Sequence, residues 1–322
     1  MKSTFAFVFP GQGSQHVGML GELARVYPQV LRMFEAVSDR LGYDLWKLVQ
    51  QGPEDRLNQT EQTQAAMLTA DVAIYNLLEQ RLGIQPAMMA GHSLGEYAAL
   101  VCAKAISLVD AAELVSQRGR LMQETVPLGF GAMAVIVGLP DDKIQSICVK
   151  ASTAQEQVTP ANYNAIGQVV IAGHAPAIAR AMALAEDLGA RMAKIIPVSV
   201  PCHCPLLTKA AERFEKYLQA ATFSVPEVPV FSNVDLSVYE TPAQIKLLLQ
   251  KQLYSPVRWV ETIQMMKQKG VEHVIECGPG RVLAGLVKRI DGSLNALSVY
   301  DSSSLDIALS KIGVKPEKEP IS

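Results

Sequence analysis

Residues 87–105 read AMMAGHSLGEYAALVCAKA, an apolar run that leads into a glycine-flanked serine and then into a helix-forming segment. Residues 91–95, GHSLG, fit the G-x-S-x-G pattern of a nucleophile elbow. In such an elbow the serine occupies a strained turn between a strand and a helix, and glycines flank it because side chains there would collide with neighbouring backbone. The stretch therefore predicts a strand over 87–93, a helix over 94–105 and Ser93 as a nucleophile, in a hydrolase-like α/β core.

Short apolar runs alternate with longer segments of helical period on both sides of this stretch. Strands that alternate with helices indicate a parallel sheet with helices on both faces. We therefore predict one large α/β domain made of residues 1–126 and 199–312. Its further strands are predicted at 5–9 and 271–278, and its further helices at 64–82, at 256–270 and from near Gly280.

The middle of the chain has a different order of elements, namely strand, helix, two strands, helix and strand. This order is that of a ferredoxin-like α+β unit, so we predict an inserted subdomain over 127–198. Its elements are predicted at 131–140, 141–151, 159–173 (two strands), 175–189 and 190–200. The polar, proline-broken tail 313–322 is expected to fray.

Composition excludes several classes of protein. Apolar residues make up 49% of the 322 residues, and 29 basic against 31 acidic side chains leave a net charge of -2. This balance predicts no nucleic-acid partner and no attraction to an anionic membrane. The N-terminal apolar run 5–9 is too short for a secretory signal, and no run is long enough for a membrane helix. Five scattered cysteines favour reduced thiols, so we expect a cytoplasmic enzyme. Separately, we expect a monomer.

A serine hydroxyl needs a neighbouring base to take its proton, and the chain has five histidines. His203 is the best placed, because it follows the strand that returns from the predicted insert, at a domain seam where catalytic residues are often carried. A packed structural histidine is the alternative. The sequence Cys202-His203-Cys204 does not predict a metal site, because in an extended segment the cysteines and the histidine face opposite ways. We expect no metal and no other bound cofactor.

The loop 10–18, PGQGSQHVG, is neither a dinucleotide-binding glycine motif nor a P-loop. A glycine-rich loop after the first strand would bring its backbone and the amide of Gln12 close to the elbow, where they would complete an oxyanion hole. A simple strand-to-helix turn is the alternative interpretation of the same residues.

Six motifs in order resemble the malonyl-CoA:acyl-carrier-protein transacylases of bacterial fatty-acid synthesis, over about residues 4–300. They are GQGSQ, GHSLGEY, QRGRLMQ (117–123), GQVVIAG (167–173), SVPCHC and ECGPGRVL (276–283). The resemblance implies an acyltransferase that moves malonyl from malonyl-CoA to the phosphopantetheine thiol of acyl carrier protein. It implies a ping-pong reaction through an ester on the serine.

The resemblance also implies a role for each matching residue. It implies that Arg118 binds the malonyl carboxylate, which would explain a preference for malonyl over acetyl. It implies a two-residue catalytic centre, in which a main-chain carbonyl orients the histidine where a hydrolase triad has an acid. The implied set is Ser93 as nucleophile, His203 as general base, Gln12 with the N–H of Leu94 as oxyanion hole, Arg118 as carboxylate ligand, and Gln252 as the residue that orients the histidine.

One position departs from the family pattern. Cys202 stands just before the histidine, where family members commonly carry serine, and the change should affect the fit of the acyl group modestly. Two other enzymes are alternatives: a discrete acyltransferase of a polyketide synthase (PKS), which differs only in its carrier, and a serine thioesterase or esterase with the same elbow. A non-catalytic scaffold of the same fold is disfavoured because Ser93, His203, Arg118 and Gln12 are all present.

Overall fold

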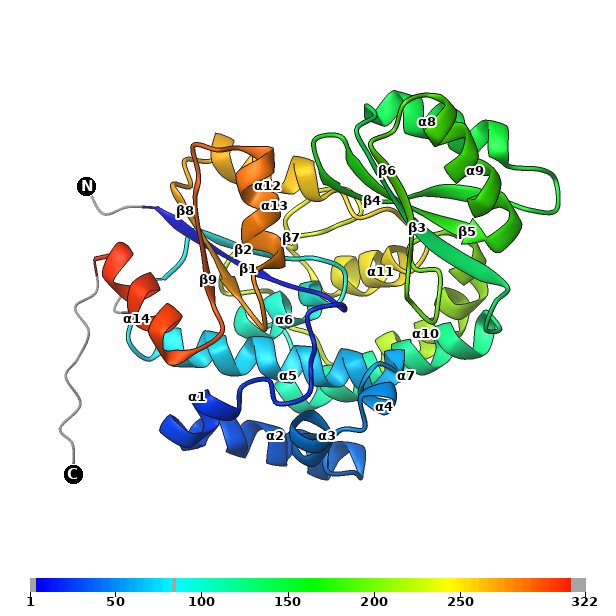
Figure 1. Ribbon diagram of the computed structural model, residues 1–322. Helices are drawn as coiled ribbons and strands as arrows, with labels where there is room; N and C mark the ends of the chain where they lie inside the picture. Colours follow the sequence, from blue (N-terminus) through cyan, green and yellow to red (C-terminus); the bar gives the residue numbers. More distant parts are fainter. Residues whose placement is uncertain (1–3, 83–84, 314–322) are drawn as a thin grey trace, which may run out of the picture.

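The protein, described by a computed structural model over residues 4–82 and 85–313, contains two β-sheets. The larger sheet has five strands in the order β7-β2-β1-β8-β9, and every neighbouring pair is parallel (Figure 1). The α/β class with a parallel sheet is therefore confirmed. The strands are β1 Phe5–Phe9, β2 Met88–Gly91, β7 Val230–Phe231, β8 His273–Cys277 and β9 Asn295–Val299.

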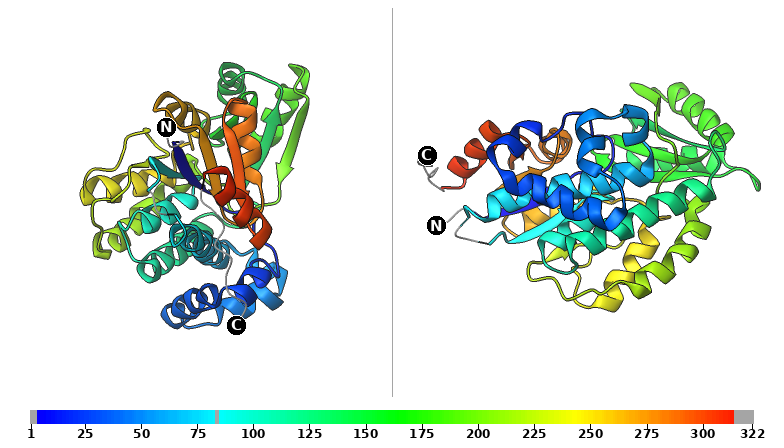
Figure 2. Two further views of the ribbon diagram at one scale, coloured as in Figure 1. Left: turned by 90° about the vertical axis from the view of Figure 1, so that its left-hand side faces the viewer. Right: turned by 90° about the horizontal axis from the view of Figure 1, so that it is seen from below.

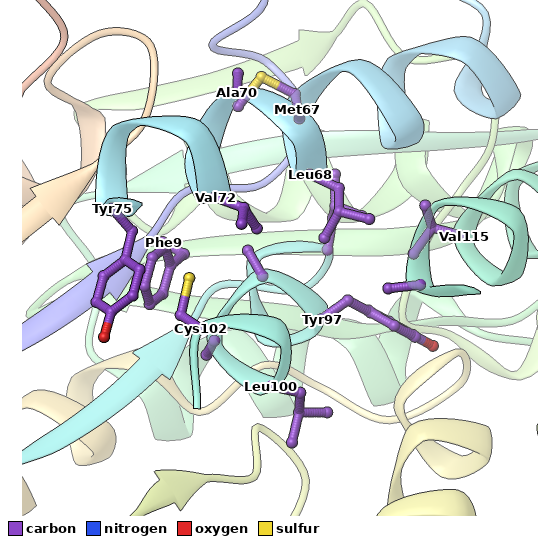
Figure 3. Close-up of a cluster of buried hydrophobic side chains, with 14 of the residues drawn as sticks. Phe9, Met67, Leu68, Ala70, Val72, Tyr75, Tyr97, Leu100, Cys102 and Val115 are labelled. Atoms are coloured by element: carbon purple, nitrogen blue, oxygen red, sulfur yellow. The ribbon is translucent and has the colours of Figure 1, made fainter. Parts of the chain in front are cut away.

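The alternation of side chains along β1 explains why helices cover both faces of this sheet. Phe5, Phe7 and Phe9 pack in a core with helices α5 (Thr60–Glu79) and α6 (Gly95–Cys102). Figure 3 shows Leu68 and Val72 of α5 in this cluster, pointing toward α6. The alternate residues of β1, alanine and valine, pack in a second core with α12 (Trp259–Gln268) and α13 (Val282–Ile290). Because successive strand residues face opposite sides, both faces of the sheet are buried.

An outer layer of N-terminal helices lies beyond α5, on the side away from the sheet (Figures 1 and 2). No secondary structure was predicted for the residues between 21 and 57 that form these helices. They are α1 Gly21–Val26, α2 Pro28–Leu41, α3 Leu45–Gln51 and α4 Glu54–Leu57.

The helices of the later part of the chain that have not yet been given are α7 Leu108–Thr125, η1 Pro205–Leu207 (a 3-10 turn), α10 Thr208–Ala220, α11 Pro242–Gln252 and α14 Ser302–Lys311.

The second sheet is antiparallel, with the order β4-β5-β3-β6, and it has the predicted ferredoxin-like order of elements. One face packs on α8 and α9, and the other packs against the segment around Cys202 and Cys204 of the larger unit. The predicted α+β insert is confirmed, whereas its boundaries at 127 and 198 stay a prediction. Its elements are β3 Gly131–Val137, α8 Asp141–Ala151, β4 Val158–Ala165, β5 Gln168–His174, α9 Ala175–Asp187 and β6 Met192–Ile196.

Several predicted elements are shorter in the structure, and three of them end or begin early for a clear local reason. The strand predicted over 190–200 ends at Ile196, because Pro197 has no N–H to continue the ladder. The helix predicted over 94–105 ends at Cys102, since Lys104 takes a left-handed φ of 60°. The helix predicted over 256–270 begins at Trp259, because the N–H and carbonyl of Val257 bond to β4.

Two further predictions concern the whole chain. Over residues 4–82 and 85–313, no helix is both long and apolar enough to cross a membrane. All five cysteines are free thiols. The tail predicted to fray lies, apart from Gly313, outside the described residues.

Candidate active site

Ser93 stands in the turn between β2 and α6, at the carboxyl edge of the parallel sheet. Its backbone is left-handed, with φ of 54°, the strained geometry that an elbow requires. The flanking glycines are required by space: a Cβ on Gly91 would lie 1.8 Å from the carbonyl carbon of Gly95, and a Cβ on Gly95 would lie 2.0 Å from the main-chain oxygen of Phe9. The structure therefore contains the strand–turn–helix geometry predicted from residues 87–105.

Asn233, which follows the neighbouring strand β7, stabilises this turn with two hydrogen bonds. Its Oδ1 accepts a hydrogen bond of 2.7 Å from the N–H of Ser93, and its Nδ2 donates one of 2.7 Å to the carbonyl of Gly91. One buried amide thus holds both sides of the strained residue. The sequence analysis missed Asn233, because nothing in its local sequence indicates that β7 pairs with β2.

His203 lies against the serine. Its Nε2 is 2.6 Å from Oγ of Ser93, and its Nδ1 is 2.8 Å from the main-chain oxygen of Gln252. A carbonyl only accepts hydrogen bonds, so Nδ1 carries the proton and Nε2 is left as the acceptor for the serine hydroxyl. The tautomer required of a general base follows from this carbonyl, and no carboxylate is needed to set it.

The surroundings of His203 keep the ring neutral. The side chain is buried, and this burial together with the positive charge of Arg118 lowers its pKa from 6.5 to about 3. Its backbone is left-handed, with φ of 61°, so residues 202–204 are not the extended segment that we expected. The neighbouring thiols of Cys202 and Cys204 donate to main-chain carbonyls. In the part of the chain that the structure describes, no group of three or more His, Cys, Asp or Glu side chains could hold a metal ion.

Arg118, in the third turn of α7, is a fully buried cation near Ser93 and His203. Its exposed fraction is 1%. Nη1 donates to Oε1 of Gln64 at 2.8 Å, and Nη2 donates to Oε1 of Gln252 at 3.0 Å. Tyr97 of α6 lies under the guanidinium, 5.7 Å from its carbon to the ring centroid.

The guanidinium of Arg118 has spare capacity for an anion. Among the described residues no carboxylate lies within ion-pair distance of it, and its buried Nε has no partner. A buried cation whose hydrogen bonds go only to two amide oxygens is left without an opposite charge, which is costly unless an anion binds. The arrangement therefore suits a substrate that carries a carboxylate.

The candidate oxyanion-hole residues lie where two adjacent parallel strands end. Gly11 follows β1 and passes so close to the elbow that a Cβ on it would lie 2.7 Å from the carbonyl oxygen of His92. This approach brings the next residue, Gln12, beside the start of α6. Among residues that the structure describes, neither the N–H of Gln12 nor that of Leu94 has a protein acceptor. Two free donors beside the serine can stabilise an oxyanion.

Glu96, in the first turn of α6, is a second residue that sequence reasoning missed as part of the site. It is fully buried, and burial raises its pKa to about 7 against the opposing effect of the hydrogen bonds that it accepts. These bonds come from Tyr239, Gln252 and Asn233. A glutamate three residues after the elbow serine was visible in the sequence, but its inward direction was not.

Comparisons with known proteins show the family to which nearly the whole chain belongs. The sequence model described as "Acyl transferase domain" matches residues 6–299. The chain is 52% identical over 305 residues to the malonyl CoA-acyl carrier protein transacylase of Escherichia coli strain K12, which covers 95% of this chain and 98% of that protein. Two solved structures are similar over nearly the whole fold.

The first is the malonyl CoA-acyl carrier protein transacylase of Coxiella burnetii, with a TM-score of 0.95 and 49% identity over 97% of this chain and 98% of that chain. The second is a malonyl-transacylase in complex with a type II PKS acyl-carrier protein, with a TM-score of 0.94 and 49% identity over 96% of this chain and 100% of that chain.

Proposed function

The chain belongs to the acyl transferase domain family, and on this premise we propose that it moves malonyl from malonyl-CoA to the phosphopantetheine thiol of acyl carrier protein, supplying fatty-acid elongation. The observation that carries the proposal is a Ser93–His203 pair next to Arg118, a buried cation that pairs with no carboxylate of the described residues. The first two groups support acyl transfer, and the third supports an acyl group that ends in a carboxylate.

The first half-reaction forms an ester on Ser93. Nε2 of His203 takes the hydroxyl proton as Oγ attacks the thioester carbonyl carbon. The N–H groups of Gln12 and Leu94 stabilise the negative oxygen of the tetrahedral intermediate. The carbon–sulfur bond then breaks, and coenzyme A leaves with the proton that His203 held.

The second half-reaction reverses these steps with a different thiol. The phosphopantetheine thiol of the carrier gives its proton to His203 and attacks the ester carbonyl of the malonyl-enzyme. The carbon–oxygen bond to Ser93 breaks, and the serine recovers its proton from His203. Throughout both half-reactions the malonyl carboxylate stays on Arg118, so the same contact orients donor and product.

The elbow assignment is tested by intact-mass spectrometry after incubation with malonyl-CoA. We expect the mass of one malonyl ester on the wild-type protein and none on Ser93→Ala. Cys202→Ala is the matched control, because of the two thiols that flank His203 it removes the less buried one. The adduct on this variant should persist. An adduct that survives in Ser93→Ala and disappears in Cys202→Ala contradicts the assignment. Addition of carrier protein should move the malonyl mass from enzyme to carrier.

A type II PKS carrier is a second candidate acceptor. It is favoured by the similarity to a malonyl-transacylase that was solved with such a carrier. The chemistry on Ser93 is the same for both carriers. Turnover of the malonyl-enzyme with a fatty-acid carrier and with a PKS carrier, at equal concentrations, distinguishes them, and we expect the fatty-acid carrier to be faster. Release of coenzyme A at the same rate without any carrier would instead indicate a thioesterase.

We further propose that the enzyme acts in the cytoplasm, as a monomer and without a bound cofactor. The free thiols, four of them buried, support a reducing compartment. In this proposal His203 transfers the protons, and the N–H groups of Gln12 and Leu94 stabilise the oxyanion, so the reaction needs no cofactor. We expect activity to survive dialysis against a metal chelator. We also expect the molar mass measured by light scattering to be that of one chain.

A further inference from the structure

Glu96 accepts hydrogen bonds from both Gln252 and Asn233, the two residues that contact the elbow and the groups around it. Its Oε2 accepts hydrogen bonds from Nε2 of Gln252 at 2.7 Å and from the main-chain N–H of Asn233 at 3.2 Å. Its Oε1 accepts from the hydroxyl of Tyr239. The carboxylate is fully buried, and it does not contact Ser93, His203 or Arg118 directly.

Gln252 contacts each of the three proposed reaction-site residues. Its main-chain oxygen accepts from Nδ1 of His203. In its side chain, Nε2 also donates to the main-chain oxygen of Ser93 at 2.9 Å, and Oε1 accepts from Nη2 of Arg118. The position of Arg118 therefore depends on which end of this amide faces it.

Glu96 and the main-chain oxygen of Ser93 together determine that orientation. The hydrogen bonds from Tyr239, Gln252 and Asn233 favour the ionised form of Glu96. An ionised carboxylate only accepts hydrogen bonds, so the NH2 end of the Gln252 amide must face it. The carbonyl end then faces the guanidinium, which only donates. With the amide reversed, two acceptors would meet at Glu96 and two donors would meet at Arg118. Each of these buried mismatches is costly.

We propose that Glu96 is a positioning residue: its carboxylate, together with the main-chain oxygen of Ser93, sets the orientation of the Gln252 amide, and through it holds Arg118 in place for the carboxylate of the acyl group. This inference rests on the proposed function, since it concerns selection of malonyl at the same site. Glu96 also complements the buried charge of Arg118, which has no directly contacting carboxylate among the described residues.

Glu96→Gln tests the proposal with little change of volume. Its carbonyl can replace Oε2, and its NH2 group can donate to the oxygen of Tyr239, so the variant can satisfy its neighbours. It lacks the charge, so only the main-chain oxygen of Ser93 remains as an acceptor that cannot exchange roles with the Gln252 amide. Tyr239→Phe is the matched control, because it removes the partner of Oε1 and leaves the contact between Oε2 and Gln252.

The measurement is the rate at which Ser93 acquires malonyl from malonyl-CoA, relative to acetyl from acetyl-CoA, by rapid-quench intact-mass analysis. We expect Glu96→Gln to lower the malonyl-to-acetyl rate ratio about 10-fold, the effect of one hydrogen bond to a charged group. Tyr239→Phe should leave the ratio within about twofold of wild type. The ratio separates positioning of Arg118 from general damage, because acetyl has no carboxylate to place.

Two results overturn the inference. One is a Glu96→Gln ratio equal to that of wild type, and the other is an equal loss for both acyl groups with a lower melting temperature, which indicates a structural role. If Glu96→Gln does not fold, Gln252→Met decides, because it removes the amide and keeps the main-chain carbonyl for His203. That variant should show the same lowered ratio, and an unchanged ratio refutes the proposal. A wild-type protein that acquires no malonyl refutes the proposed function as well.

Discussion

The main-chain carbonyl of Gln252 accepts a hydrogen bond from Nδ1 of His203, with 2.8 Å between oxygen and nitrogen. In a Ser-His-Asp triad a carboxylate occupies this place and stabilises the imidazolium as it forms. A neutral carbonyl orients the ring without adding a negative charge. Here burial, and secondarily the positive charge of nearby Arg118, lowers the pKa of His203, so the ring keeps its neutral form more strongly than an isolated histidine does.

This relationship predicts how acylation depends on pH. The pKa of His203 is lowered to about 3, so its Nε2 stays unprotonated as the pH falls from about 8 to about 5. The donor for this test is acetyl-CoA, because acetyl has no carboxylate whose binding would follow the titration of Glu96 near pH 7. We expect the single-turnover rate of Ser93 acylation by acetyl-CoA to show no loss with a midpoint near 6.5, the ordinary value for histidine. Rapid-quench measurement across this range checks the prediction. A decline centred near 6.5 would mean that the ring is not protected from protonation.

Replacement of Arg118 should change selectivity more than it changes catalysis. Arg118→Met keeps the volume and removes the charge, so the malonyl carboxylate loses its charge-assisted hydrogen bonds. We expect malonyl transfer to fall by about 100-fold or more, and acetyl transfer by only a few-fold. Steady-state kcat/KM for both thioesters measures the difference. Equal losses for malonyl and acetyl would remove the proposed role.

Substitution of an elbow glycine should destabilise the fold itself and not only the reaction. In Gly95→Ala the new Cβ would lie 2.0 Å from the main-chain oxygen of Phe9, and neither group belongs to a flexible side chain. We expect little soluble protein, or a melting temperature well below that of wild type. Gly285→Ala is the control, because no atom lies within 4 Å of its added Cβ. A wild-type melting temperature for Gly95→Ala contradicts the packing described here.

Asp71 predicts a dependence of stability on pH. It is fully buried in α5, and neither carboxyl oxygen has a partner. Burial, and secondarily the charge of Glu276, raises the pKa of Asp71 well above 3.8. The folded state therefore keeps this proton at pH values where the unfolded chain has lost it. By linkage, the stability that it contributes is fully present below about 3.8 and is lost as the pH rises toward the folded-state pKa.

Asp71→Asn removes this titration and keeps the shape. We expect the melting temperature of the wild-type protein to fall more than that of the variant between about pH 5 and pH 8. The difference between the two slopes isolates Asp71, because all other titrating groups are common to both proteins. Parallel slopes would show that Asp71 does not keep its proton in the folded state.

The nucleophile could be predicted from sequence because its geometry is local. An elbow needs two glycines and a serine within five residues, and the preceding strand and following helix are adjacent in the chain. The α/β class and the order of elements in the insert are likewise readable, since they depend on periodicity and turn residues. In residues 21–57, α2 has readable signals, with Pro28 at its start and Gly42 after its end. The short helices α1, α3 and α4 were harder, because they take their stability from packing against α2 and α5.

Only the tertiary structure decided what lies around Ser93. Arg118 has the sequence pattern of a solvated helical arginine, and its role was implied by family resemblance alone. Its burial follows from the way α5, α6 and α7 pack together. The sequence did not reveal the roles of Asn233 and Glu96, because these roles come from contacts with residues as much as 156 positions away. Sequence determines which backbone turns are sterically allowed, whereas the fold determines which polar groups are buried together and must satisfy one another.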